Sequence, residues 1–138
     1  MMTMRCYLAP SEIEGLGVYS TVDIKKGDIV WKHDPLLDLS IPVSHMEASP
    51  EHVREFLDRY TYDHPTQPGM LVLDGDEGRF MNHSLTPNLD FSSKDSGIAL
   101  TDIPAGTELT CNYGDFIKGM VHMQPPRHKV NGAAQAHI

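Results

Sequence analysis

The stretch Asp23-Ile24-Lys25-Lys26-Gly27-Asp28-Ile29-Val30 decides the fold, because the chain repeats its pattern at Asp102-Ile103-Pro104-Ala105-Gly106-Thr107-Glu108-Leu109. Each copy has the pattern of a strand end, a tight turn whose glycine supplies backbone freedom, and a new apolar-rich strand. Short strands joined by such turns predict a mainly β protein. Turn pairs of this kind are common in β proteins, so the repeat indicates the fold more than the function.

One helix is predicted between the two copies. Ser49 can cap it, and Pro50 suits its first turn. Apolar residues then recur at i, i+3, i+4 and i+7, at Val53, Phe56, Leu57 and Tyr60. This spacing predicts a helix whose apolar stripe packs on the core.

A strand is predicted at Met70–Leu73, and an acidic turn follows it at residues 74–78. The acidic side chains could hold a cation. However, the turn lacks the spaced ligands and the closing glutamate of a calcium loop. We therefore interpret residues 74–77 as a solvated turn.

The composition is that of a soluble globular protein, with 138 residues of which 40% are hydrophobic and 22% charged. This length suits one domain around one core. No apolar run approaches the roughly 20 residues that a membrane span needs, and the first residues lack the apolar stretch of a signal peptide. The sequence predicts a soluble intracellular protein, cytoplasmic in the simplest interpretation, with a nuclear location or export by another route left open.

Nineteen acidic and eleven basic residues give a net charge of −8. Nucleic acid is not expected as the main partner, because neutralising phosphates needs clustered Lys and Arg. A basic protein or peptide would be attracted instead, although plain solubility explains the charge equally well. Cys6 and Cys111 are too few for a zinc cluster or a disulfide framework, and we expect both as free thiols.

Two segments carry the chemistry: Arg79-Phe80-Met81-Asn82-His83-Ser84 and Glu108-Leu109-Thr110-Cys111-Asn112-Tyr113-Gly114. With Glu14-Gly15-Leu16-Gly17, residues 23–30 and the dipeptide Pro87-Asn88, they resemble the successive motifs of a compact SET domain, as found in SET-domain protein lysine methyltransferases. The resemblance runs from about residue 8 to residue 116. The Gly-x-Gly alone would be weak evidence, whereas the Asn-His-Ser and Tyr-Gly segments form a specific pair.

The resemblance implies a mainly β, β-clip fold of several small sheets, with a knot-like crossing that places these two segments side by side at the active site. It places the SET domain at residues 6–118, with a helical insert at about residues 44–62. Residues 119–138 contain Pro125-Pro126, a run of small residues and no hydrophobic period. We expect them to form a weakly ordered tail.

The resemblance also implies a cofactor, S-adenosylmethionine, and a basic protein or peptide substrate that carries a target lysine. The residues implied at the cofactor are Glu14, Gly15, Leu16, Gly17, Phe80, Met81, Asn82, His83 and Phe116. The glycine segment would hold the amino-acid end through main-chain groups, while Asn82 and His83 would contact the methionyl amino group and the adenine edge. A histidine packed in a turn remains an alternative for His83, and a core aromatic for Phe116.

Tyr113 is implied as the catalytic residue, because its hydroxyl could orient the reacting amine and face the charge that develops at the methyl group. Without the flanking motif, a half-buried strand tyrosine would be the simpler interpretation. The substrate channel is implied at His33, Cys111 and Tyr113, with Trp31 in the core. Methyl transfer is an in-line displacement, so positioning would dominate catalysis.

Two departures from the family pattern limit what can be transferred. Cys111 stands two residues before Tyr113, where many relatives have Phe or Tyr, so the number of methyl groups added stays open. The zinc-binding cysteine cluster that closes the channel in many relatives is missing. Residues 116–121, the tail or a second subunit in a homodimer could close it. The histidines in the tail have no spacing that predicts a metal site.

Two non-catalytic alternatives remain, namely a binding module on the same β-clip scaffold and an inactive SET module that binds a protein partner. An active enzyme is favoured because one set of residues is intact together: Gly15, Gly17, Asn82, His83 and Tyr113. The sequence does not identify the target protein or its lysine.

Overall fold

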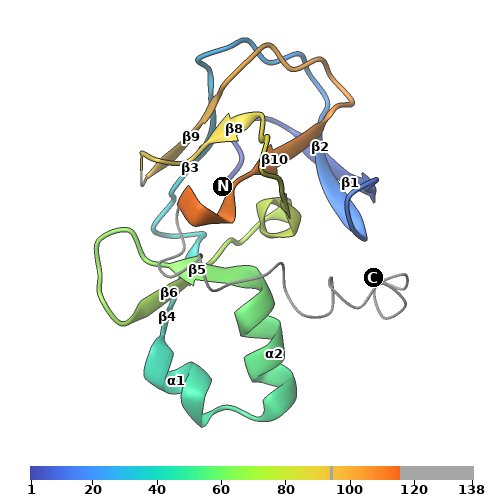
Figure 1. The fold of residues 1–138 in the computed structure, drawn as a ribbon. Helices are drawn as coiled ribbons and strands as arrows, with labels where there is room; N and C mark the ends of the chain where they lie inside the picture. Colours follow the sequence, from blue (N-terminus) through green and yellow to red (C-terminus); the bar gives the residue numbers. More distant parts are fainter. Residues whose placement is uncertain (94, 116–138) are drawn as a thin grey trace.

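The computed structural model describes residues 1–93 and 95–115 (Figure 1). The expectations for Phe116 and for the tail at 119–138 lie outside these ranges. One sheet has the strand order β1-β2-β10-β7, formed by Cys6–Pro10, Leu16–Ser20, Glu108–Cys111 and Asn82–His83. A second has the order β3-β9-β8, formed by Ile29–Lys32, Ser96–Ala99 and Leu89–Asp90. A third has the order β4-β6-β5, formed by Leu39–Pro42, Met70–Leu73 and Thr61–Asp63. The predicted fold class, mainly β with several small sheets, is confirmed.

The repeated turns pair with each other. Ile24 and Ile103 form an antiparallel bridge in which each backbone N–H donates to the other residue's carbonyl oxygen at 2.8 Å. Both side chains are buried. The turn glycines, Gly27 and Gly106, have φ angles of 91° and 81°, in the left-handed region that favours glycine. The repeat therefore builds a single two-part element, with a buried pair of isoleucines and two exposed turns.

The aspartate that opens each copy fixes the turn of the other copy. Asp23 accepts a hydrogen bond from the backbone N–H of Ala105 at 2.9 Å. Asp102 accepts one from the backbone N–H of Lys26 at 2.8 Å. Sequence positions about eighty residues apart are thus tied by the same contact made twice, which explains why both copies begin with Asp.

The insert contains two helices, α1 at Val43–Ala48 and α2 at Glu51–Tyr60, at one end of the molecule (Figure 1). The predicted cap at Ser49 is wrong: Ser49 ends α1, and its hydroxyl donates to the carbonyl oxygen of His45 at 2.7 Å. The predicted core stripe of α2 is also mostly wrong. Only Leu57 of that stripe is buried, and Phe56 is 42% exposed. A peripheral helix buries a narrow face, so its spacing overstates its contact with the core.

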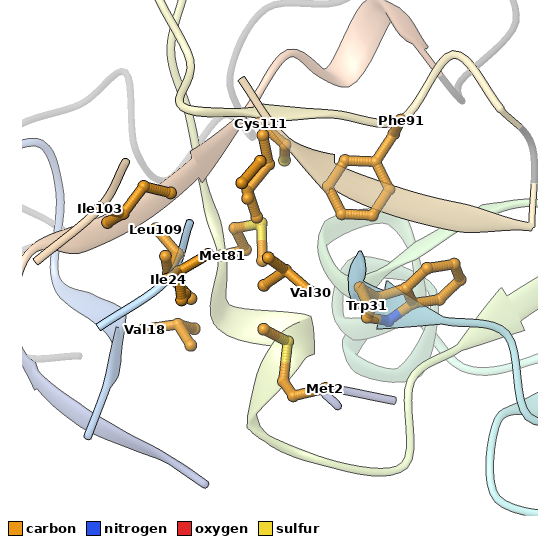
Figure 2. Packing of buried hydrophobic residues seen from close by; sticks show 12 residues of the cluster. Met2, Val18, Ile24, Val30, Trp31, Met81, Phe91, Ile103, Leu109 and Cys111 are labelled. Carbon is orange, nitrogen blue, oxygen red and sulfur yellow. The ribbon is translucent and has the colours of Figure 1, made fainter. Parts of the chain in front are cut away.

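The hydrophobic core lies between the first two sheets and the turn that precedes β7 (Figure 2). It consists of Met2, Val18, Ile24, Val30, Trp31, Met81, Leu89, Phe91, Ala99, Ile103, Leu109 and Cys111. Burying each large apolar side chain contributes about 1.5–3 kcal/mol, so this cluster holds the small sheets together. Cys6 and Cys111 are both free thiols, as expected.

The remaining described elements are two 3₁₀ turns, η1 at Glu77–Phe80 and η2 at Tyr113–Asp115. They flank the strands β7 and β10, which carry the chemistry-bearing segments. Within residues 1–93 and 95–115, no helix is long and apolar enough to cross a membrane. In the same ranges, no group of three or more His, Cys, Asp or Glu side chains is arranged to hold a metal ion.

Candidate active site

The Asn-His segment and the segment that leads to Tyr113 lie side by side as parallel strands. In the pairing of β7 with β10, Asn82 is opposite Thr110 and His83 is opposite Cys111. The backbone N–H of Ser84 continues the contact by donating to the carbonyl oxygen of Cys111 at 2.9 Å. This adjacency was predicted from the resemblance, and the strand pairing confirms it.

Asn82 joins these strands to the glycine segment. Its side chain is 1% exposed. Its amide nitrogen donates to the carbonyl oxygens of Glu14 and Leu16 at 3.0 and 3.1 Å, and to the Glu108 carboxylate at 2.8 Å. Gly15, between the two carbonyls, has a φ angle of 46°. Three segments far apart in the sequence therefore converge on one buried amide.

Glu108 is a site residue that the sequence interpretation missed. Its carboxylate accepts hydrogen bonds from the Ser11 hydroxyl at 2.7 and 2.9 Å, in addition to the one from Asn82. The Ser11 oxygen in turn accepts from the backbone N–H of Ile13 at 2.9 Å. Its position could have indicated this role, because Glu108 is the first residue of the Glu-Leu-Thr segment, and this segment pairs with the strand that begins at the glycines.

Tyr113 is held at both ends. Its hydroxyl donates to the carbonyl oxygen of Met81 at 2.9 Å, and its backbone N–H donates to Nδ1 of His83 at 3.0 Å. The rings of His83 and Tyr113 lie 5.0 Å apart. Because Nδ1 of His83 accepts this bond, the ring proton lies on Nε2. The arrangement gives His83 a positioning contact to the tyrosine.

Burial sets the protonation states of this pair. Burial raises the pKa of the Tyr113 hydroxyl above its ordinary value near 10, so the hydroxyl stays protonated at neutral pH. Burial also lowers the pKa of His83, so its imidazole stays neutral. A protonated phenol and a neutral imidazole are orienting groups at this pH, and neither acts as a strong base.

A pocket of about 60 Å³ opens beside Tyr113. It is lined by Trp31, Arg59, Tyr60, Thr61, Tyr62, Asp74, Gly78, Arg79, Met81, Phe91, Cys111 and Tyr113. Of the implied channel residues, Cys111 and Tyr113 line it together. His33 does not line it, whereas Trp31, two residues earlier, is part of the wall. Phe80 lies outside the lining, with its ring 5.3 Å from that of Tyr60.

The polar groups of the pocket were not anticipated. The interpretation of Asp74 as part of a solvated turn is wrong, because this residue is only 6% exposed. Trp31 and Tyr62 both donate hydrogen bonds to its carboxylate, and these bonds replace the lost contact with water. Two arginines also line the pocket. Nε and Nη1 of Arg59 and Nε of Arg79 are buried without a hydrogen-bond partner among the described residues. A buried donor without a partner is costly, so these nitrogens are available to an anionic group of a ligand.

Small β-sheets around a glycine segment, an Asn-His strand and a tyrosine held at their junction define the class of this protein. A model of the SET domain matches residues 15–114, and the chain belongs to this family of protein lysine methyltransferases. Histone-lysine N-methyltransferase 2D of Homo sapiens is 29% identical over 116 residues, which is 78% of this chain. The chain spans only 2% of the length of that relative.

Two solved structures have a similar fold. The Neurospora SET domain protein DIM-5, a histone lysine methyltransferase, gives a TM-score of 0.55 at 26% identity, over 81% of this chain and 53% of that one. Chaetomium thermophilum Polycomb Repressive Complex 2 bound to GSK126 gives a TM-score of 0.63 at 24% identity, over 86% of this chain and 17% of that one. At that identity the second comparison shows the fold alone.

Proposed function

We propose that this chain transfers a methyl group from S-adenosylmethionine to the side-chain amine of a lysine in a protein substrate. The observation that carries the proposal is the position of Tyr113. It lies in one wall of a narrow pocket, fixed by Met81 and His83, in the 3₁₀ turn η2 that follows the strand beside the Asn-His segment.

The residues present fit the amino-acid end of this cofactor. An ammonium group needs acceptors, and the Glu108 carboxylate and the carbonyl oxygens of Glu14 and Leu16 are gathered around the Asn82 amide nitrogen. Each of these oxygens can accept a further hydrogen bond. A carboxylate needs donors, and Arg59 and Arg79 have buried nitrogens without a partner. These residues would therefore hold the cofactor at its amino and carboxylate groups.

When bound, S-adenosylmethionine supplies an activated methyl group on a positively charged sulfur. The lysine nitrogen would form its bond to the methyl carbon as the carbon–sulfur bond breaks, and the proton that the amine gives up would pass to solvent. A free lysine has a pKa near 10.4, so the amine must be favoured in its neutral form. A narrow, poorly hydrated pocket and the adjacent sulfonium charge would both penalise the ammonium form and lower that pKa.

Tyr113 would act by position. Its hydroxyl proton is directed to the carbonyl oxygen of Met81 at 2.9 Å, so a lone pair of the oxygen is available to the charge that develops at the methyl group. His83 would keep the tyrosine in place through the backbone N–H of Tyr113. Positioning of this kind is the main source of catalysis in an in-line transfer.

The substrate class follows from the relatives and from charge. The human relative is named histone-lysine N-methyltransferase 2D. This chain carries a net charge of −8, which would attract a basic protein. We expect a histone or another lysine-rich protein as the substrate. We also expect the chain to act in the cytoplasm or nucleus, where reducing conditions keep its cysteines as thiols. A second copy of the chain could close the lysine channel in a homodimer.

The direct test incubates the protein with methyl-labelled S-adenosylmethionine and a panel of basic proteins that includes histones. We expect label in protein lysines, and a loss of about a hundredfold in rate for Tyr113→Phe, which keeps the ring and removes the hydroxyl. Tyr7→Phe is the matched control, since Tyr7 is 42% exposed on β1. A folded wild type that neither transfers label nor shifts in melting temperature with the cofactor would favour the binding-module alternative.

A further inference from the structure

Among the described residues that line the pocket beside Tyr113, Asp74 is the one acid, and Arg59 and Arg79 are the basic residues. One carboxylate oxygen accepts from the indole N–H of Trp31 at 3.2 Å, and the other accepts from the hydroxyl of Tyr62 at 2.8 Å. Both donors line the pocket as well. The carboxylate therefore holds two aromatic side chains in the wall of the same cavity.

The wall around Asp74 is aromatic. The Trp31 ring lies 5.5 Å from the ring of Phe91, its neighbour in Figure 2. It also lies 6.1 Å from the ring of Tyr62. Aromatic faces attract cations, and a carboxylate beside them adds a full negative charge. This combination suits an alkylammonium group and gives nothing comparable to a neutral chain of the same shape.

The cation that acts on the Asp74 carboxylate is the amino group of Met1. Among the described residues, no lysine or arginine lies within ion-pair distance of it. The groups that act on it are the hydroxyl of Tyr62, the amino group of Met1, and the carboxylates of Asp38 and Asp76. Burial raises the pKa of Asp74 to about 6, so it is largely ionised at pH 7 or above. The amino group of Met1, which pairs with Asp38 at 3.0 Å, offsets only part of the cost of burying the Asp74 carboxylate, and a cationic ligand would offset more.

We propose that Asp74 is the cation-selecting residue of this pocket, and that it draws in the ammonium form of the substrate's lysine while it holds Trp31 and Tyr62 as the wall. This inference rests on the proposed function for the identity of the ligand. Asp74 is a substrate-binding residue in this view. The neutral amine that reacts forms afterwards, when the proton is lost to solvent.

Trp31 makes the inference testable without methyl transfer, because it is the one tryptophan of the chain and its indole N–H bonds to Asp74. We would titrate the wild-type protein with the blocked tripeptide acetyl-Gly-Lys-Gly-amide and with the same peptide carrying norleucine, and follow Trp31 emission. We expect the lysine peptide to reach half-saturation at a concentration at least about tenfold lower than the norleucine peptide. A tenfold difference corresponds to about one charge-assisted hydrogen bond.

Two variants separate charge from shape. Asp74→Asn keeps the size of the side chain and removes its charge, so the two peptides should bind within about twofold of each other. Tyr62→Phe removes the 2.8 Å hydrogen bond and keeps the charge, so the preference for lysine should persist. A preference that survives in Asp74→Asn would overturn the inference. The inference would also be overturned if Tyr62→Phe lost as much of the lysine preference as Asp74→Asn does. That result would assign the preference to the shape of the wall.

Should Asp74→Asn fail to fold, the wild type gives the same answer through pH. The lysine preference should fall as pH drops through about 6, because Asp74 gains a proton while the lysine stays charged. The titration is repeated in His33→Asn, because the His33 ring lies 6.4 Å from that of Trp31 and its protonation could also change the emission. A preference that is constant from pH 5 to 8 in His33→Asn would overturn the inference.

The methyl-transfer assay distinguishes this inference from the proposed function. Methyl transfer by a wild type with no lysine preference at Trp31 would support the function and overturn the role of Asp74. A lysine preference without any transfer would support the role of Asp74 as a cation-binding residue and count against the enzyme. In an active enzyme, Asp74→Asn should raise KM for the peptide more than it lowers kcat.

Discussion

The side-chain carboxylate of Glu108 occupies the space beside Gly17 where any other residue would place its Cβ atom. A Cβ at position 17 would lie 2.4 Å from Oε2 and 2.7 Å from Cδ of Glu108. Gly17 does not have the positive φ angle of Gly15. The second glycine of the segment is therefore required by packing, and the group packed on it is the carboxylate that Ser11 and Asn82 bind.

Gly17→Ala should displace this carboxylate and so disorganise the candidate cofactor site. We expect a loss of about 1–3 kcal/mol in the free energy of unfolding, the usual cost of overpacking, and cofactor binding weakened by at least about tenfold. Chemical denaturation and calorimetric titration with S-adenosylmethionine would measure both. In a Glu108→Ala background the same change should cost clearly less. Equal costs in the two backgrounds would show that the contact with Glu108 is not the cause.

The stability of the fold should depend on pH through Asp74. Burial raises the pKa of Asp74 from 3.8 to about 6, so between these values the folded state keeps a proton that the unfolded state has lost. The stabilisation is complete below pH 3.8 and disappears as pH rises through about 6. The free energy of unfolding of Asp74→Asn, relative to that of the wild type, should therefore rise by up to about 3 kcal/mol between pH 4 and pH 7. Denaturation curves of both proteins across this range would test it, and a constant difference would contradict it.

The two repeated turns could be predicted from the sequence because the information that specifies a turn is local. The glycines at 27 and 106 follow turn chemistry that needs no tertiary context, whereas the hydrogen bonds of Asp23 and Asp102 to the other copy depend on the tertiary fold. The neighbouring positions of the Asn-His and Tyr-Gly segments came from the family resemblance, since no local pattern indicates that strands so far apart pair in parallel.

The pocket could not be predicted because its parts come from distant segments. Asp74 lies among acids in a turn, a pattern typical of solvated residues, and its burial depends on Trp31, 43 positions earlier. Strand alternation failed at β3, where a register irregularity between Ile29 and Trp31 lets Val30 and Trp31 both be buried. An irregularity of this kind redirects side chains, so Trp31 is buried together with its neighbour Val30 instead of on the opposite face.

The Cys6 thiol should be unreactive in the folded protein. Burial, and then the charges of Glu77 and Asp76, raise the pKa of Cys6 to about 12. The thiolate is the reactive form, so alkylation by iodoacetamide at pH 8 should be about a thousandfold slower than for a free thiol. Mass spectrometry of the labelled peptide would measure the rate, and Glu77→Gln should increase it. Rapid labelling of Cys6 before unfolding would contradict the prediction.

Cys111→Phe should limit the number of methyl groups that the enzyme adds, provided that the proposed function is correct. The Cys111 thiol is 2% exposed and lines the pocket together with Tyr113, so a phenyl ring at this position must take up space in the pocket. We expect a loss of about 1–3 kcal/mol in stability from overpacking and a lower final methylation state than wild type. Cys111→Ala leaves the pocket open and should reach at least the wild-type state. Mass spectrometry of the substrate lysine after exhaustive reaction would compare the three proteins. If all three end in the same methylation state, the space beside Tyr113 is not what determines the product.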